Sequence, residues 1–206
     1  MTEIKVSQTV QEFFKAAYQV WSGEQLLGEA YIDKNALGGT IVYQQGNEEY
    51  QLIFDQKMGN RFYSVIDPQG RQIGKIERKE QKGSFFKPGY FYTRAVLHGR
   101  KYHIYEVAMG KEGIYYPCYE QLGEEEGRQV GLIHRDALVV DMKETYDCYV
   151  KEGEYLLLTV LFALYNDFWN FRHTGQAAKN TKQVEYFYTF NKKLKAKYDP
   201  DFIKGK

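Results

Sequence analysis

The sequence predicts a mainly β protein whose sheet closes around one buried helix. The 206 residues include 19 Tyr and 13 Phe, residue types that favour pleated, half-buried surfaces. Most of the chain alternates short apolar runs with turns that contain Gly or Pro. In contrast, the stretch Glu154 to Phe171 is apolar on every side from Tyr155 to Tyr165. Such a segment is typical of a helix surrounded by its own protein.

The length and composition fit one soluble domain, residues 1–206. Apolar residues make up 43% of the chain and charged residues 27%, so a packed core is expected. Within this domain we expect barrel-forming hairpins at 18–153, a central buried helix at 154–171 and a polar, basic tail at 174–206. Met1 to Gln8 has no apolar signal-peptide core, so a cytoplasmic protein is the simplest expectation.

The first part of the chain predicts a short helix. Val10, Phe13, Phe14 and Ala17 fall at helical spacing within Thr2 to Ala17. Strand, turn and strand patterns then follow one another. The expected hairpins lie within Tyr18 to Asp33, Thr40 to Phe54 and Tyr63 to Arg78.

Part of this pattern repeats. Gly70 to Arg78 reads GRQIGKIER and Gly127 to Arg135 reads GRQVGLIHR, and looser matches extend the unit to about 50 residues. Gly28, Gly74 and Gly131 occupy equivalent points of three hairpins. We expect the sheet to bend there, because Gly inside a strand usually marks a bulge or a barrel corner. No helix start follows these glycines, which argues against the alternative of a phosphate-binding loop.

Two further strands, Ala137 to Asp141 and Thr145 to Val150, precede the central helix, and Glu154 complements its dipole. The uninterrupted apolar run is about 11 residues, or about 17 Å of helix, against a bilayer core of roughly 30 Å. We therefore expect no transmembrane segment. In the tail, Val184 to Tyr198 predicts a second, exposed helix that ends before Pro200.

The order of these elements resembles the tubby-like fold, and most closely its LURP-one-related and phospholipid-scramblase-like branch. The residues that carry the resemblance are Gly70 to Arg78, Gly127 to Arg135, Tyr146, and Leu156 to Asp167, where Asn166 and Asp167 close the apolar helix. The resemblance covers roughly Tyr18 to Phe171. It implies a closed antiparallel barrel of about 12 strands, in two similar halves, around a central hydrophobic helix near the C-terminus.

The activity-linked features of that family are mostly missing from this chain. The scramblase relatives have a Pro-rich arm, a Cys cluster and an acidic calcium loop, whereas this sequence has four Pro and two separated cysteines, Cys118 and Cys148. We expect these two to be small buried hydrophobes. The phosphoinositide-binding basic residues of tubby proteins do not align either. The resemblance therefore supplies no binding residue.

No catalytic or metal-binding motif stands out. The histidines His98, His103, His134 and His173 lack zinc spacing, and Glu124 to Glu126 reads as a solvated loop. Nucleophile-elbow, zinc-protease and Walker sequences are absent. A barrel filled by a helix has little lumen, so a binding site should be external. We expect a protein that is not an enzyme, with no catalytic residues, cofactor or metal.

Charge distribution gives the only functional hint. The net charge is +1, but Arg71 to Lys101 carries nine basic residues against two acidic ones, and Glu106 to Glu126 carries one Lys against six Glu. Neighbouring parts of the chain thus have opposite fields. The simpler alternative to a binding site is that these charged side chains alternate with buried ones along each strand and form the solvent-exposed face of the barrel. The candidate residues for binding an anionic surface are Lys75, Arg78, Lys79, Lys82, Lys87, Arg94, Arg100 and Lys101.

Three functions remain open on this basis. The first is a non-enzymatic protein-interaction or scaffold module that uses the aromatic tail or the acidic loop. The second is a peripheral binder of anionic lipid headgroups through a basic external face. Nucleic-acid binding ranks below both, because the basic and aromatic tail matches no recognised module. The partner is thus an unknown protein or an anionic membrane surface, and the sequence predicts no oligomeric state.

Overall fold

The computed structural model describes residues 1–12, 15–35, 38–57, 60–83, 88–123, 125–170 and 182–204. The strands are β1 (Thr2–Gln11), β2 (Lys15–Ser22), β3 (Gln25–Asn35), β4 (Gly38–Gln45), β5 (Glu48–Lys57), β6 (Asn60–Ile66), β7 (Gln72–Gln81), β8 (Tyr90–Leu97), β9 (Arg100–Tyr105), β10 (Val107–Ala108), β11 (Ile114–Leu122), β12 (Glu125–Arg135), β13 (Leu138–Val140), β14 (Thr145–Val150) and β15 (Lys182–Val184). The helices are α1 (Leu156–Asn170) and α2 (Lys192–Lys195), with short 3-10 turns at Gly110–Glu112 and Gly153–Tyr155.

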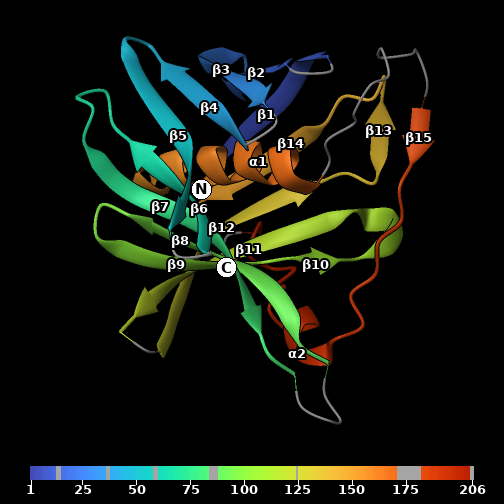
Figure 1. The fold of residues 1–206 in the computed structure, drawn as a ribbon. Helices are drawn as coiled ribbons and strands as arrows, with labels where there is room; N and C mark the ends of the chain where they lie inside the picture. The colour runs from blue at the N-terminus through green and yellow to red at the C-terminus, as the bar shows by residue number, and fades with distance from the viewer. Residues whose placement is uncertain are drawn as a thin grey trace.

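The main sheet closes into a barrel. Its strands follow the order β11, β12, β14, then β1 to β9, and β9 pairs back onto β11 from Cys118–Ile104 to Gln121–Lys101. Every pairing is antiparallel, and β10 extends the sheet beside β11. This arrangement confirms the expected mainly β fold, a closed barrel of 12 antiparallel strands (Figure 1).

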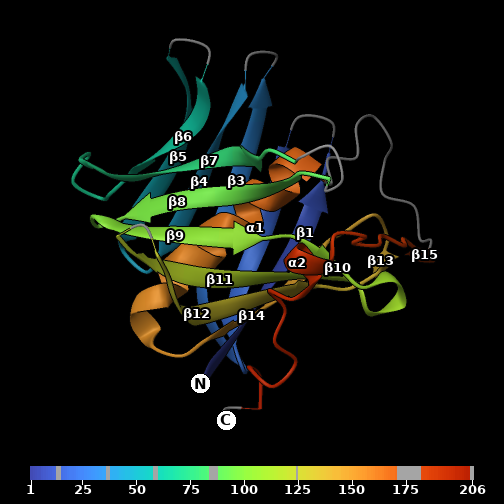
Figure 2. The same cartoon turned by 90° about the horizontal axis from the view of Figure 1, so that it is seen from below.

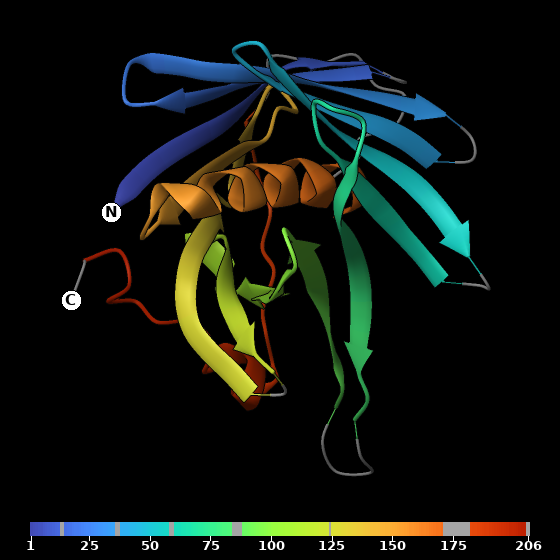
Figure 3. The same cartoon turned by 90° about the vertical axis from the view of Figure 1, so that its left-hand side faces the viewer.

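Helix α1 lies inside the barrel (Figures 1 and 3). Its residues from Leu158 to Phe168 are all buried, whichever side of the helix they face. Aliphatic and aromatic side chains of the strands surround it, and together they form one core cluster. The prediction of a helix buried on all faces is therefore confirmed. Among the described helices, none is both long and apolar enough to cross a membrane.

The three repeated glycines stand at equivalent bulges, as expected. Each Gly pairs with a residue of the preceding strand of its hairpin, and the pairing register shifts by one residue directly before it in the sequence. The residue without a direct partner is the apolar one just before each Gly, namely Leu27, Ile73 and Val130. A Cβ atom on Gly74 would lie 2.1 Å from the carbonyl oxygen of Val96. The bend thus brings two backbones too close for any side chain.

The predicted N-terminal helix is wrong, because Thr2–Gln11 and Lys15–Ser22 are barrel strands. The apolar residues that suggested a helix do not face the core: Val10 is 40% exposed, and its cross-strand partner Ala17 lies between the buried Ala16 and Tyr18. In addition, β1 contains a bulge, a register shift between Gln8 and Val10. After this bulge Gln11, rather than Val10, faces inward, so the interior positions are no longer two residues apart. Phe13 and Phe14 lie outside the described residues.

The predicted helix over Val184 to Tyr198 is also mostly wrong. Only Lys192–Lys195 is helical, and β15 pairs with β13. The segment from 182 to 204, called the strap below, runs along the outer wall formed by β9 to β12 (Figure 2). Leu194 is buried against Tyr105 and Val107, because these tertiary contacts outweigh the local helical pattern.

Candidate functional site

The barrel wall is split between two hairpins. The ladder between β6 and β7 ends at the Tyr63–Ile76 pair. Beyond that pair, β6 stays bonded to β5 as far as Asn60, and β7 stays bonded to β8 as far as Gln81. The hairpin of β5 and β6 and the hairpin of β7 and β8 therefore diverge, as Figure 3 shows. We call the gap between them the hairpin cleft.

The hairpin cleft encloses a hollow of about 370 Å³. The C-terminal turn of α1 forms its floor, where Tyr63 lies edge-on to both Tyr165 and Trp169 at ring-centroid distances of 5.7 and 6.4 Å. Trp169 is 43% exposed, which is unusual for a helix that is otherwise buried. The residues that line the hollow are Arg61, Phe62, Tyr63, Glu77, Arg78, Lys79, Tyr165 and Trp169.

Arg78 lies at the centre of this end of the barrel. It stands two residues after the buried Ile76 on β7, so strand alternation places it on the same face of the strand, where its side chain is exposed to the hairpin cleft. Its guanidinium carbon lies 4.5 Å from the ring centroid of Phe91, a cation–π contact. No acidic side chain in the described part of the chain forms an ion pair with Arg78. The guanidinium thus lies against an aromatic ring, with Glu106 as a nearby acidic group.

A second hollow of about 350 Å³ adjoins the first, between β8 and the strap. Arg78 and Phe91 line it, and so do Phe187 and Phe190 of the strap. A cavity of about 20 Å³, lined by Arg78 and Trp169, shares lining residues with both hollows. Glu106 also lines the second hollow, so that hollow is less favourable for an anion than the hairpin cleft.

On the outer face of β7, Glu77 gathers three of the predicted cations. Its carboxylate lies 2.8 Å from Lys79, 3.2 Å from Lys75 and 2.5 Å from Arg94. Burial alone would raise the pKa of Glu77, but the hydrogen bonds from these cations lower it to about 2. The outer wall therefore carries a charge cluster in which one carboxylate offsets part of the positive charge.

The eight predicted residues do not form one patch. Arg78 and Lys79 both line the hairpin cleft, and Lys79 also joins Lys75 and Arg94 around Glu77. Arg100 lies at the opposite end of the barrel, 2.8 Å from Glu154 at the start of the helix, and Lys101 follows it with an exposed side chain. Lys82 is exposed just beyond β7, and Lys87 lies outside the described residues.

Sequence reasoning missed Arg61 and Trp169. Arg61 falls outside the basic segment, yet it stands two residues before the buried Tyr63 and so faces the same side of β6. That alternation was a usable signal. The divergence of the two hairpins could not be predicted from the sequence, because it depends on where the hydrogen-bonded ladder between β6 and β7 ends. No acidic side chain that the structure describes forms an ion pair with Arg61.

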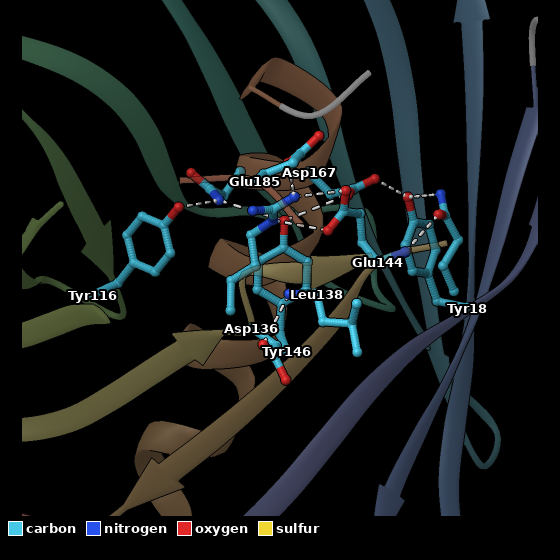
Figure 4. A network of polar contacts seen from close by, with 11 residues as sticks. Tyr18, Tyr116, Asp136, Leu138, Glu144, Tyr146, Asp167 and Glu185 are labelled. Carbon is cyan, nitrogen blue, oxygen red and sulfur yellow. Dashed lines mark hydrogen bonds and ion pairs between the residues drawn. The ribbon is translucent and has the colours of Figure 1, made fainter. Parts of the chain in front are cut away.

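A buried polar network fixes α1 within the barrel (Figure 4). Tyr18 donates a hydrogen bond to one carboxylate oxygen of Asp167, and Tyr146 donates to the other at 3.3 Å. Asn166 donates to the hydroxyl of Tyr116 at 3.0 Å. Burial, together with the charge of Asp167, raises the pKa of Tyr18 well above its usual value. These bonds set the rotation of the helix and so position Trp169 in the hairpin cleft.

The network continues to the strap through Arg135, whose side chain is fully buried. Arg135 donates two hydrogen bonds to Glu144, at 2.8 and 2.9 Å, and one to Glu185 of the strap at 2.5 Å. Gln8 joins the two halves, because it accepts from the backbone amide of Glu144 and donates to Tyr18. The network of Figure 4 therefore connects the strap to the core helix.

The hairpin cleft combines charged walls, mostly basic, with an aromatic floor, an arrangement that suits an acidic ligand. Two arginines face it, aromatic rings form its floor, and its acidic residue, Glu77, is engaged by three cations. No group of three or more His, Cys, Asp or Glu side chains in the described ranges is placed to hold a metal ion. In comparisons with known proteins, the chain matches no family model, no curated protein and no solved structure.

Proposed function

We propose that this chain is a non-enzymatic protein-interaction module that binds an acidic segment of a partner in the hairpin cleft. The observation that carries the proposal is the pair Arg61 and Arg78, which line one hollow without an ion-pair partner among the described acidic residues. Guanidinium groups bind carboxylates through two parallel hydrogen bonds. Trp169 and Phe62 add apolar contact area beside them.

This combination matches the energetics of protein interfaces. Arg, Trp and Tyr are the residue types that most often dominate binding energy when they line a well-packed pocket. The contact with Phe91 restricts the exposed side chain of Arg78, which reduces the side-chain entropy lost when a partner binds. The relation to the tubby-like fold belongs to the same proposal: the barrel and its central helix have the order that the resemblance implies, and a non-enzymatic role is compatible with it.

The test is selection of short peptides displayed on phage against the immobilised full chain. We expect the selected peptides to be rich in Asp and Glu and to lose about tenfold or more in affinity for the double variant R61Q/R78Q. The matched control is K101Q, which removes an exposed positive charge from the outer wall and should leave affinity unchanged. Selection without acidic enrichment, or equal binding to the double variant, would overturn the proposal.

A second candidate is a peripheral binder of anionic lipid headgroups. Exposed aromatic side chains surround Arg78: Phe91 is 50% exposed, Trp169 43% and Phe190 90%. Aromatic rings beside Arg and Lys are typical of surfaces that sit at a membrane interface. Each Lys or Arg near an anionic surface contributes about 1 kcal/mol.

Flotation with vesicles of phosphatidylcholine, with and without phosphatidylserine, separates the two candidates. The second predicts flotation that requires phosphatidylserine, weakens with added salt and is lost in F190S. The control is R100Q, at the opposite end of the barrel. If the full chain does not float with phosphatidylserine vesicles at low salt, the membrane candidate is wrong and the peptide proposal is unaffected.

A further inference from the structure

We infer that the partner segment binds in an extended conformation, as a strand added to the free edge of β7. This inference rests on the proposed function and specifies how the hairpin cleft would recognise its partner. Beyond Ile76, β7 continues to Gln81 with β8 on one side only. Its other side faces the hairpin cleft, where no described strand pairs with it.

The free edge is long enough to hold a peptide. Five residues of β7, from 77 to 81, follow the end of the ladder with β6. At about 3.3 Å per residue they span roughly 17 Å. Alternate N–H and C=O groups along such an edge point away from β8 and are available to a further antiparallel or parallel strand. Main-chain bonds to an exposed edge are the basis of affinity in strand-addition complexes.

The side chains around the edge specify the sequence that fits. Successive residues of an added strand would point to opposite faces of the sheet. One face looks toward Arg78, with Arg61 across the hairpin cleft and Trp169 below. The other face looks toward Lys79, which is already bonded to Glu77. The segment should therefore carry acidic side chains at every second position, with residues of either polarity between them.

The edge also limits where the acidic side chains sit. Glu80 stands two residues beyond Arg78 and, by alternation, on the same face of β7. Its carboxylate would repel an acid placed opposite it, so the acidic positions should lie over Arg78 and toward Arg61. The other wall of the hairpin cleft offers only residues 60–62 of β6, which makes β7 the longer template.

The test uses backbone methylation of a defined probe. The probe is a capped peptide of about ten residues in which Glu and Val alternate, and its neutral counterpart replaces Glu with Gln. All Glu amides of an extended peptide point to one side and all Val amides to the other. We make two analogues, one N-methylated at every Glu and one at every Val, and titrate each into the full chain.

Strand addition predicts that one analogue loses about tenfold or more in affinity while the other stays within about threefold of the parent. Two analogues that bind alike, whether well or poorly, would overturn strand addition. So would failure of the parent peptide to bind while the peptides from phage selection still do. If neither the parent peptide nor any acidic peptide from phage selection binds, the proposed function itself is wrong.

Hydrogen exchange gives an independent readout on the same complex. We expect amides in residues 78–81 to gain protection when the parent peptide binds, with β11 unchanged as an internal control. The variant R78Q should weaken the parent without changing which analogue binds better, since that preference comes from the backbone. Protection confined to other strands would overturn the inference.

Discussion

At the scale of single residues, Glu77 shows how one carboxylate can organise a charged wall. Its side chain is 4% exposed and bonded to Lys75, Lys79 and Arg94, which come from two neighbouring strands. The cations would otherwise repel one another across the ladder. Because its pKa falls to about 2 in the folded protein, from an ordinary value of 4.5, the unfolded chain binds more protons between these values.

The sign of this difference gives a pH prediction. The stabilisation by Glu77 should be complete above about pH 5 and lost as the pH falls toward 2, in total roughly 2 kcal/mol, because the three cations are partly exposed and screened. Urea unfolding at a series of pH values measures it. E77Q should remove this part of the pH dependence, whereas E80Q, at an exposed site on the same strand, should keep it. An E77Q profile parallel to that of the unmodified protein would contradict the assignment.

At the scale of elements, the local sequence pattern predicted which segments are buried, but it did not always predict whether a segment forms a helix or a strand. The helix α1 could be read from sequence because no side of it is polar between Tyr155 and Tyr165. The β1 strand could not, because a bulge after Gln8 interrupts the two-residue alternation of buried side chains that marks a strand. The hairpin cleft was equally hidden: Arg61 and Arg78 lie 17 positions apart, and the divergence of their hairpins depends on distant pairings. Asn166 and Asp167 close the apolar run of the predicted helix, yet both are buried and hydrogen-bonded.

The central position of α1 predicts a sharp contrast along one helix. Leu161 is 1% exposed, so L161D would bury a charge without a partner and should yield no cooperatively folded protein. The matched control is W169D, which places the same charge at the 43% exposed end of the helix and should fold. Circular dichroism with thermal unfolding measures both. A cooperative transition for L161D near that of the unmodified chain would show that α1 is not the core.

At the scale of the whole molecule, the barrel and the strap have different roles. The strands between residues 2 and 150 close through their own ladders, and α1 fills the interior, so the barrel does not need the strap for its topology. The strap adds burial on the outer wall. Leu194 and Phe202 are 7% and 4% exposed, Tyr198 stacks on Tyr115 at 4.2 Å between ring centroids, and Glu185 bonds to Arg135.

Removal of residues 182–206 should therefore leave a folded but weakened barrel. Burial of each large apolar side chain contributes about 1.5–3 kcal/mol, and Arg135 would keep Glu144 but lose Glu185. We expect a loss of several kcal/mol in urea unfolding with an unchanged far-ultraviolet spectrum. The control is F190S, at the 90% exposed ring of the strap, which should unfold like the parent. Equal stability of the shortened chain would mean that the strap does not dock in solution. An unfolded product would mean that barrel closure depends on it, through the link from Glu185 and Arg135 to Glu144 and Gln8.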